Sequence, residues 1–252
     1  MTQEWTFHRD EELEALRARL RKRRSLLVHG PMGVGKTLLL KRLLREHPQM
    51  LYSSDSAAMQ PTFRNLGLAL LAARDPGVAQ AVGARGAEGL NYKSAVALRG
   101  IVIDALRKRK YYIVLDHLKL PSQSFAAAVR EITDWSQTPM VAVARSTHME
   151  DTGFLHSLFA ERTDRFELRN FPKPEAKQFA QECVRRAGLS AQNLGEFIER
   201  VLEFSAGNPG AILSMLEMAQ RPEYRSAEHV KITPLYVDFR LNLPLGYRFY
   251  GQ

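Results

Sequence analysis

Short apolar runs and longer amphipathic segments follow one another along the first part of this chain. The apolar runs have the length of buried strands, and they lie at 25–29, 50–53, 111–115, 140–144 and 165–168. Between them, apolar residues recur every three or four positions, as in helices, over 10–24, 36–46, 62–74, 94–110 and 125–135. Strands that alternate with helices are typical of a parallel sheet covered by helices, so we expect a doubly wound α/β fold.

The pattern changes after position 172, where only helical periodicity remains. It predicts helices at about 174–188, 193–205 and 209–220. We therefore expect an α/β domain over 1–171, a C-terminal helical lid over 172–220 and a tail over 221–252.

Two further segments have patterns of their own. The glycine-rich stretch 75–92 predicts a long mobile loop, which is either a plain linker or a contact for a partner or substrate. Apolar and polar residues alternate strictly over 235–243, which predicts a half-buried strand. That strand either docks against the core or pairs with another protomer or protein.

The chain carries a phosphate-binding pattern between its first strand and the helix that follows. Residues 30–37 fit G-x-x-x-x-G-K-[ST] at every fixed position. In such a turn the backbone N–H groups cradle phosphates at the positive end of the helix. The predicted binding residues are Gly30, Pro31, Met32, Gly33, Val34, Gly35, Lys36, Thr37 and Leu38. Lys36 is expected to reach the β- and γ-phosphates, and the Thr37 hydroxyl to bind Mg²⁺.

A second metal-binding acid is expected at the end of a neighbouring hydrophobic strand. Asp116 closes the apolar run 111–115 and meets that description. With Thr37 it would hold the ion between the phosphates. The alternative interpretation of Asp116 is a helix-capping or turn aspartate.

Composition adds two observations about partners and location. The net charge is +9, and basic residues cluster at 17–24 and 107–110. Both runs lie at the ends of predicted helices, where they complement the helix dipole, or they form a patch for DNA. Charge alone does not decide between these interpretations. The single cysteine, Cys183, excludes an internal disulfide framework. Without a signal-peptide pattern or a long apolar run, we expect a cytoplasmic protein that is not in a membrane.

Over residues 5–220 the chain resembles the AAA+ and STAND groups of P-loop ATPases, including their NB-ARC-like and archaeal-ATPase-like branches. The segment 7–13 resembles the hydrophobic-x-Arg-x-x-Glu-Leu stretch that borders the adenine pocket in those families, and its arginine is Arg9. Residues 30–37 match the Walker A motif and 111–116 match Walker B. The strand 141–146 resembles sensor 1, where Arg145 would lie near the γ-phosphate. Residues 207–213 resemble the G-x-P motif of the helical lid, which contains Pro209.

The resemblance implies an assembled ATPase. Arg162 lies just before the predicted fifth strand, where AAA+ proteins place an arginine finger for a neighbour's nucleotide. Arg165 is the second candidate, and an exposed loop arginine is the alternative. His117 stands where these enzymes usually have the glutamate that activates water. It would orient or deprotonate the water or be a poor substitute, so we expect slow Mg²⁺-dependent hydrolysis.

Three functions remain open at this point. The first is an ATPase that uses the nucleotide state to set lid position and assembly, as a homo-oligomer or with a partner protein. The second is a DNA-binding regulator or loader of the replication or transposition type. The third is a non-hydrolysing scaffold stabilised by its nucleotide. ATP is expected rather than GTP because the resemblance implies it and no N-K-x-D motif is present.

Overall fold

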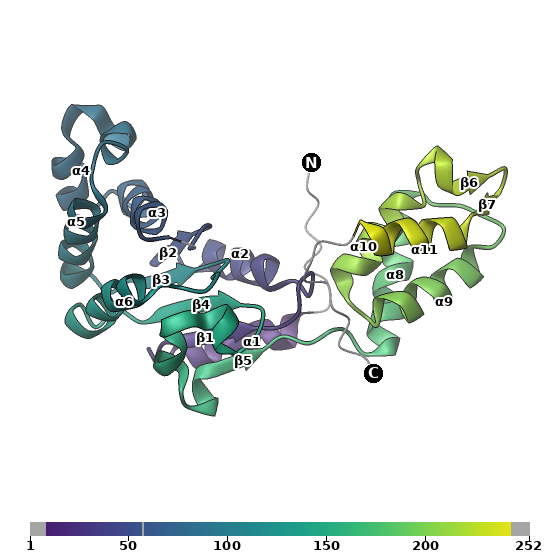
Figure 1. Cartoon of the computed structure of the whole chain (residues 1–252), viewed down its shortest axis with the longest axis horizontal. Coiled ribbons are helices and arrows are strands. Elements are labelled where there is room, and N and C mark those ends of the chain that lie inside the picture. The colour runs from purple at the N-terminus through teal and green to yellow at the C-terminus, as the bar shows by residue number, and fades with distance from the viewer. Residues whose placement is uncertain (1–8, 57, 243–252) are drawn as a thin grey trace. The chain divides into compact units, whose positions relative to one another are not determined.

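The structure is a computed structural model that describes residues 9–56 and 58–242. It divides into two compact units, shown in Figure 1. The α/β unit comprises residues 11–30 and 36–167. The helical unit comprises, among the described residues, 9–10, 31–35 and 168–242. The phosphate-binding motif is therefore divided between the two units.

The α/β unit alternates strands and helices as the sequence predicts. The first part of the chain forms α1 (Asp10–Leu20), β1 (Leu26–His29), α2 (Lys36–Glu46), β2 (Met50–Ser53), α3 (Met59–Ala72), α4 (Pro76–Val82) and a 3₁₀ segment η1 (Gly83–Leu90). The second part forms α5 (Ala95–Lys108), β3 (Tyr112–Leu115), α6 (Gln123–Trp135), β4 (Met140–Ala144), α7 (Met149–Thr152), η2 (Gly153–Phe159), η3 (Arg162–Asp164) and β5 (Arg165–Glu167).

The five strands form one parallel sheet in the order β2-β3-β4-β1-β5. The predicted α/β fold with a parallel sheet is therefore confirmed. Ile113 of β3 joins the core that α3, α5 and α6 cover, and α3 packs against α5 (Figure 1). The preceding residue, Tyr112, points to the opposite face of the sheet because side chains alternate along a strand. Its hydroxyl donates to the Leu20 carbonyl of α1 at 2.7 Å, so α1 lies on that second face.

The stretch 75–92 is helical, so the prediction of a mobile loop is wrong. Asp75 caps α4, since its carboxylate accepts from the N–H groups of Gly77 and Val78 at 3.0 and 3.1 Å. Val78, Val82 and Leu90 then bury their side chains in the core of the unit. A Cβ at position 89 would lie 3.0 Å from the Val82 carbonyl oxygen, which is tighter than an ordinary contact, so Gly89 permits close packing. Gly83 and Gly86 instead have φ values of +58° and +53°, which favour glycine.

The helical unit contains the three helices predicted after position 172 and a short C-terminal extension. Its elements are α8 (Lys173–Ala187), α9 (Leu194–Ser205), α10 (Pro209–Met218), η4 (Pro222–Tyr224), the antiparallel strands β6 (Arg225–Ser226) and β7 (His229–Val230), and α11 (Ile232–Leu241). Side chains from all four α-helices share one apolar core. The boundaries of a separate lid and tail remain a prediction.

The alternating segment 235–243 forms helix α11 up to Leu241, so the predicted strand is wrong there, and position 243 lies outside the described residues. Leu235 and Phe239, one helical turn apart, are buried, whereas Val237 is 47% and Leu241 76% exposed. Leu235 and Phe239 fit both the i, i+4 spacing of a helix and the i, i+2 spacing of a strand, and packing against the helical unit's core favours the helix. Among the described residues, no helix is both long and apolar enough to span a bilayer.

Candidate functional site

Thr37 and Asp116, predicted as a metal-binding pair, lie side by side in the α/β unit. Thr37 is in the first turn of α2, directly after β1, and Asp116 follows β3. Both strands are parallel, so their carboxyl ends meet at one edge of the sheet. The Thr37 hydroxyl donates to Asp116 Oδ2 at 2.9 Å, and the Asp116 side chain is only 1% exposed.

Tyr52 of β2 also belongs to this site, although the sequence analysis missed it. Its hydroxyl donates to Asp116 Oδ2 at 2.8 Å. Burial and then the hydrogen bond to this carboxylate raise the pKa of Tyr52, so the phenol keeps its proton. The sequence showed a hydroxyl within a short apolar strand, but only the structure shows that this strand neighbours β3 in the sheet.

Lys36 and Arg145 bring positive charge to the same edge. Lys36 Nζ donates to the Gly30 carbonyl at 2.6 Å. Burial lowers the pKa of Lys36 to about 8; the Asp116 carboxylate opposes this shift, and the Arg145 guanidinium adds to it. Arg145 follows β4, and its carbonyl accepts from the Gly30 N–H at 3.2 Å. A bound anion would favour the charged form of Lys36 and reverse the effect of burial.

His117 and Leu38 are both on the surface of the α/β unit. The His117 N–H donates to Asp116 Oδ1 at 2.8 Å, while its ring Nε2 lies 3.7 Å from Asp116 Oδ2. The backbone of His117 has a φ of +56°, a conformation that histidine adopts more readily than most residues. The imidazole is exposed beside the acid, and Leu38 is also exposed.

Residues 31–35 of the motif make their contacts within the helical unit. Gly33 and Gly35 have φ values of +79° and +102°, which favour glycine. The Gly33 carbonyl accepts from the Gly210 N–H at 2.9 Å, and the Met32 carbonyl accepts from Asn208 Nδ2 at 2.9 Å. The first turn of α10 therefore holds the middle of the phosphate-binding motif.

Asn208, next to the predicted Pro209, is a second residue that the sequence analysis missed. Its Oδ1 caps α10 by accepting from the Ala211 N–H at 3.1 Å, and Pro209 occupies the first position of the helix. Gly207 has a φ of +75°, and a Cβ there would lie 2.1 Å from the Phe171 carbonyl oxygen. An asparagine directly before a proline at a helix start was the available signal.

Arg9 is buried in the helical unit. Its guanidinium donates to the carbonyls of Val34 at 3.3 Å and Arg169 at 2.7 Å, and it lies 4.2 Å from the ring centroid of Phe171. Arg9 therefore connects the phosphate-binding motif to the segment before α8. Two other residues of the predicted adenine-pocket segment, Phe7 and His8, lie outside the described residues.

Arg162 lies apart from the other predicted residues. It belongs to η3, just before β5, and so lies at the amino edge of the sheet, opposite Lys36 and Asp116. Its side chain is exposed and makes no hydrogen bond or ion pair with any described residue of the chain. The structure does not bring Arg162 to the site of its own chain.

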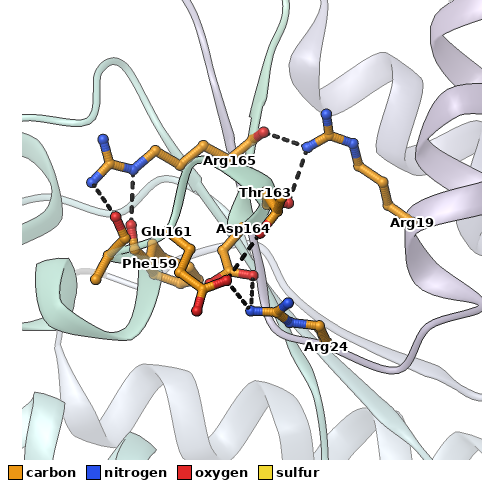
Figure 2. Close-up of polar contacts among 8 residues, drawn as sticks. Arg19, Arg24, Phe159, Glu161, Thr163, Asp164 and Arg165 are labelled. Atoms are coloured by element: carbon orange, nitrogen blue, oxygen red, sulfur yellow. Dashed lines mark hydrogen bonds and ion pairs between the residues drawn. The ribbon is translucent and has the colours of Figure 1, made fainter.

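Figure 2 shows how the segment around Arg162 is held. Arg24 pairs with Glu161 and Asp164, each at 2.8 Å. Arg19 donates to the carbonyls of Thr163 and Arg165. Arg165 itself donates from Nε to the Phe159 carbonyl at 2.8 Å. The side chain of this second arginine-finger candidate is therefore held within its own segment.

The strand order, the motif between β1 and α2 and the acid after β3 define a P-loop ATPase of the AAA+ class. Residues 6–144, more than half of the chain, match the AAA ATPase domain family, and the chain belongs to that family. This confirms the resemblance to AAA+ P-loop ATPases. A search of curated proteins found no match.

Several solved structures share the fold at low sequence identity. A Walker-type ATPase of Pyrococcus abyssi is 16% identical, with a TM-score of 0.59 over 86% of this chain and 68% of that one. Orc1 of Aeropyrum pernix, solved in complex with DNA, is 18% identical, with a TM-score of 0.60 over 93% and 65%. A STAND protein of Pyrococcus horikoshii with a tetratricopeptide repeat sensor is 14% identical, with a TM-score of 0.51 over 94% and 32%.

Proposed function

We propose that this chain binds ATP with Mg²⁺ and hydrolyses it slowly. The observation that carries the proposal is the placement of the Thr37 hydroxyl and the Asp116 carboxylate 2.9 Å apart, at the edge that also carries Lys36. The residues fit the ion, because hydroxyl and carboxylate oxygens are the ligands that Mg²⁺ prefers. When bound, Mg²⁺ neutralises charge on the phosphates.

The other residues around the motif have distinct proposed roles. Lys36 and the backbone N–H groups of the motif bind the phosphates, and Arg145 senses the γ-phosphate. Arg9 and Pro209 border the base. His117 orients the attacking water from an exposed position, which is a weaker arrangement than a buried carboxylate base, and hydrolysis is slow for that reason.

The catalytic arrangement is completed by a second copy of the chain. The Arg162 side chain makes no hydrogen bond or ion pair with a described residue and lies away from the phosphate-binding edge, so it acts on a neighbour's nucleotide. Arginines that act in this way raise phosphoryl-transfer rates by about 10³–10⁵. The nucleotide state changes the position of the helical unit and the assembly, since Asn208 and Gly210 already bind the motif.

The test is phosphate release from ATP with and without Mg²⁺. Turnover should require Mg²⁺ and Lys36. The rate per chain should rise with protein concentration, because a second copy completes the site, and it should fall in Arg162→Ala. The matched control is Arg64→Ala, which removes another exposed arginine without a partner among the described residues. Tight ATP binding without turnover would contradict hydrolysis and favour a scaffold. Equal turnover in the Arg162 and Arg64 variants would contradict the arginine finger.

A DNA-binding regulator is the second candidate, because the structure brings the two basic runs of the sequence together. Arg23 of the first run donates to the Tyr111 carbonyl, directly after the second run, at 3.5 Å. The Orc1 relative was solved with DNA. Stimulation of ATP turnover by duplex DNA would support this candidate over the first, and unchanged turnover would count against it.

A further inference from the structure

Five cations from the two basic runs form one surface at the amino edge of the sheet. We call this surface the amino-edge cluster, and its members are Arg21, Lys22, Arg23, Arg109 and Lys110. The runs meet through Arg23, whose guanidinium donates to the Tyr111 carbonyl and lies 4.9 Å from the Tyr112 ring centroid. Arg109 and Lys110 directly precede these tyrosines in the chain.

The charge of this cluster is largely uncompensated. All five side chains are exposed, and none of them forms an ion pair with a described acidic residue. By contrast, Arg17 pairs with Glu14 and Glu46, and Arg24 pairs with Glu161 and Asp164. Repulsion among neighbouring uncompensated cations favours an anionic partner.

The helix dipoles do not need the whole cluster. Arg17 and Arg19 already supply positive charge in the last turn of α1, and Arg107 and Lys108 do so in the last turn of α5. The five cations of the cluster follow the last helical residues, Leu20 and Lys108, and add to that charge. The helix-dipole interpretation and the nucleic-acid interpretation that the sequence left open are therefore compatible.

An exposed aromatic ring borders the cluster. Trp135, the last residue of α6, is 62% exposed, and its ring centroid lies 5.4 Å from the Arg107 guanidinium. Arg107 is two residues before Arg109. The helices α5 and α6 both end just before strands of the parallel sheet, so these residues share the amino edge.

We propose that the amino-edge cluster and Trp135 bind single-stranded nucleic acid, with phosphates on the cations and a base stacked on the tryptophan ring. A track of cations beside an exposed aromatic ring is the arrangement that binds unpaired strands. A duplex hides the faces of its bases, so it would use the cations and leave the Trp135 ring without a stacked base. This activity goes beyond ATP hydrolysis and lies at the opposite edge from Lys36 and Asp116.

The first test measures the anisotropy of a labelled 20-nucleotide oligo-dT strand with the full chain as salt is varied. The Arg109→Gln/Lys110→Gln variant should bind more weakly, and its slope of log affinity against log salt should be shallower by about 1.4, since each single-strand phosphate contact contributes about 0.7. The matched control, Arg64→Gln/Arg221→Gln, removes the same charge from exposed positions outside the cluster. Equal affinities and slopes for the two variants would overturn the proposal.

The second test separates stacking from charge. Trp135→Ala should lose about tenfold affinity for oligo-dT, whereas Trp135→Phe should keep most of it. In a Trp5→Phe background, which leaves Trp135 as the chain's single tryptophan, oligo-dT should quench fluorescence. Tighter binding of a 20-base-pair duplex, with no effect of Trp135→Ala, would overturn the single-strand assignment. Lys36→Ala should bind oligo-dT normally, so failure of the ATPase proposal and failure of this one are distinguishable.

Discussion

Raising the pH from 7 to 9 should weaken ATP binding about tenfold through the titration of Lys36. Burial lowers the pKa of Lys36 to about 8 in the free protein. Against bound phosphates, the ammonium should regain a pKa near its ordinary value of about 10.4. Affinity then falls by a factor of 1 + 10^(pH − 8), which is about 1.1 at pH 7 and about 11 at pH 9.

Isothermal titration calorimetry can measure this effect in two ways. The affinity is determined at pH 7, 8 and 9, and the proton uptake at pH 8 is obtained from two buffers with different ionisation enthalpies. Half of the Lys36 side chains are neutral at a pH equal to their pKa, so about 0.5 proton should be taken up per ATP. Burial raises the pKa of Cys183 to about 12, so its thiol does not contribute in this range.

Lys36→Arg is the control, since arginine stays protonated throughout this range. Its ATP affinity should be nearly constant from pH 7 to 9, provided that its thermal unfolding matches that of the wild type. An equally flat profile for the wild type would refute the reasoning from burial. An equal fall in the arginine variant would show that another group titrates.

Three further predictions concern stability, measured by urea unfolding. Tyr52→Phe should lower the free energy of unfolding by about 1–2 kcal/mol because a hydrogen bond to the Walker B carboxylate is lost; no change would mean that water replaces the hydroxyl. Gly153→Ala should cost more than about 2 kcal/mol, since its φ is +51° and a Cβ would lie 2.4 Å from a backbone oxygen. Gly188→Ala, with a φ of +61° and open space, should cost about 1 kcal/mol, and equal losses would contradict the clash. Phe239→Ala should cost about 3–5 kcal/mol and Val237→Ala less than about 0.5, whereas similar losses would contradict helix α11.

Sequence alone predicted the alternating elements of the α/β unit and the three helices after position 172. Buried strands such as Met140–Ala144 are continuous apolar runs, and helices such as α6 have a helical period that differs from that of a strand. The errors occurred where composition misled. Glycines at 83, 86 and 89 indicated a loop, although Gly83 and Gly86 adopt positive φ values within a helical stretch and Gly89 packs closely against Val82. The pattern over 235–243 satisfied two periods at once.

The sequence by itself determined that this chain has a phosphate-binding motif, because the lysine, the threonine and the glycines of that motif lie within the eight positions 30–37. It also indicated Asp116, since an acid that closes an apolar strand is a local pattern. Only the tertiary structure decided that Tyr52 shares that carboxylate, that Asn208 and Gly210 hold the motif, and that Arg23 joins the two basic runs. Each of these contacts joins residues that are 64 to 177 positions apart in the chain. A local sequence pattern carries no information about which distant segments the packed core brings together.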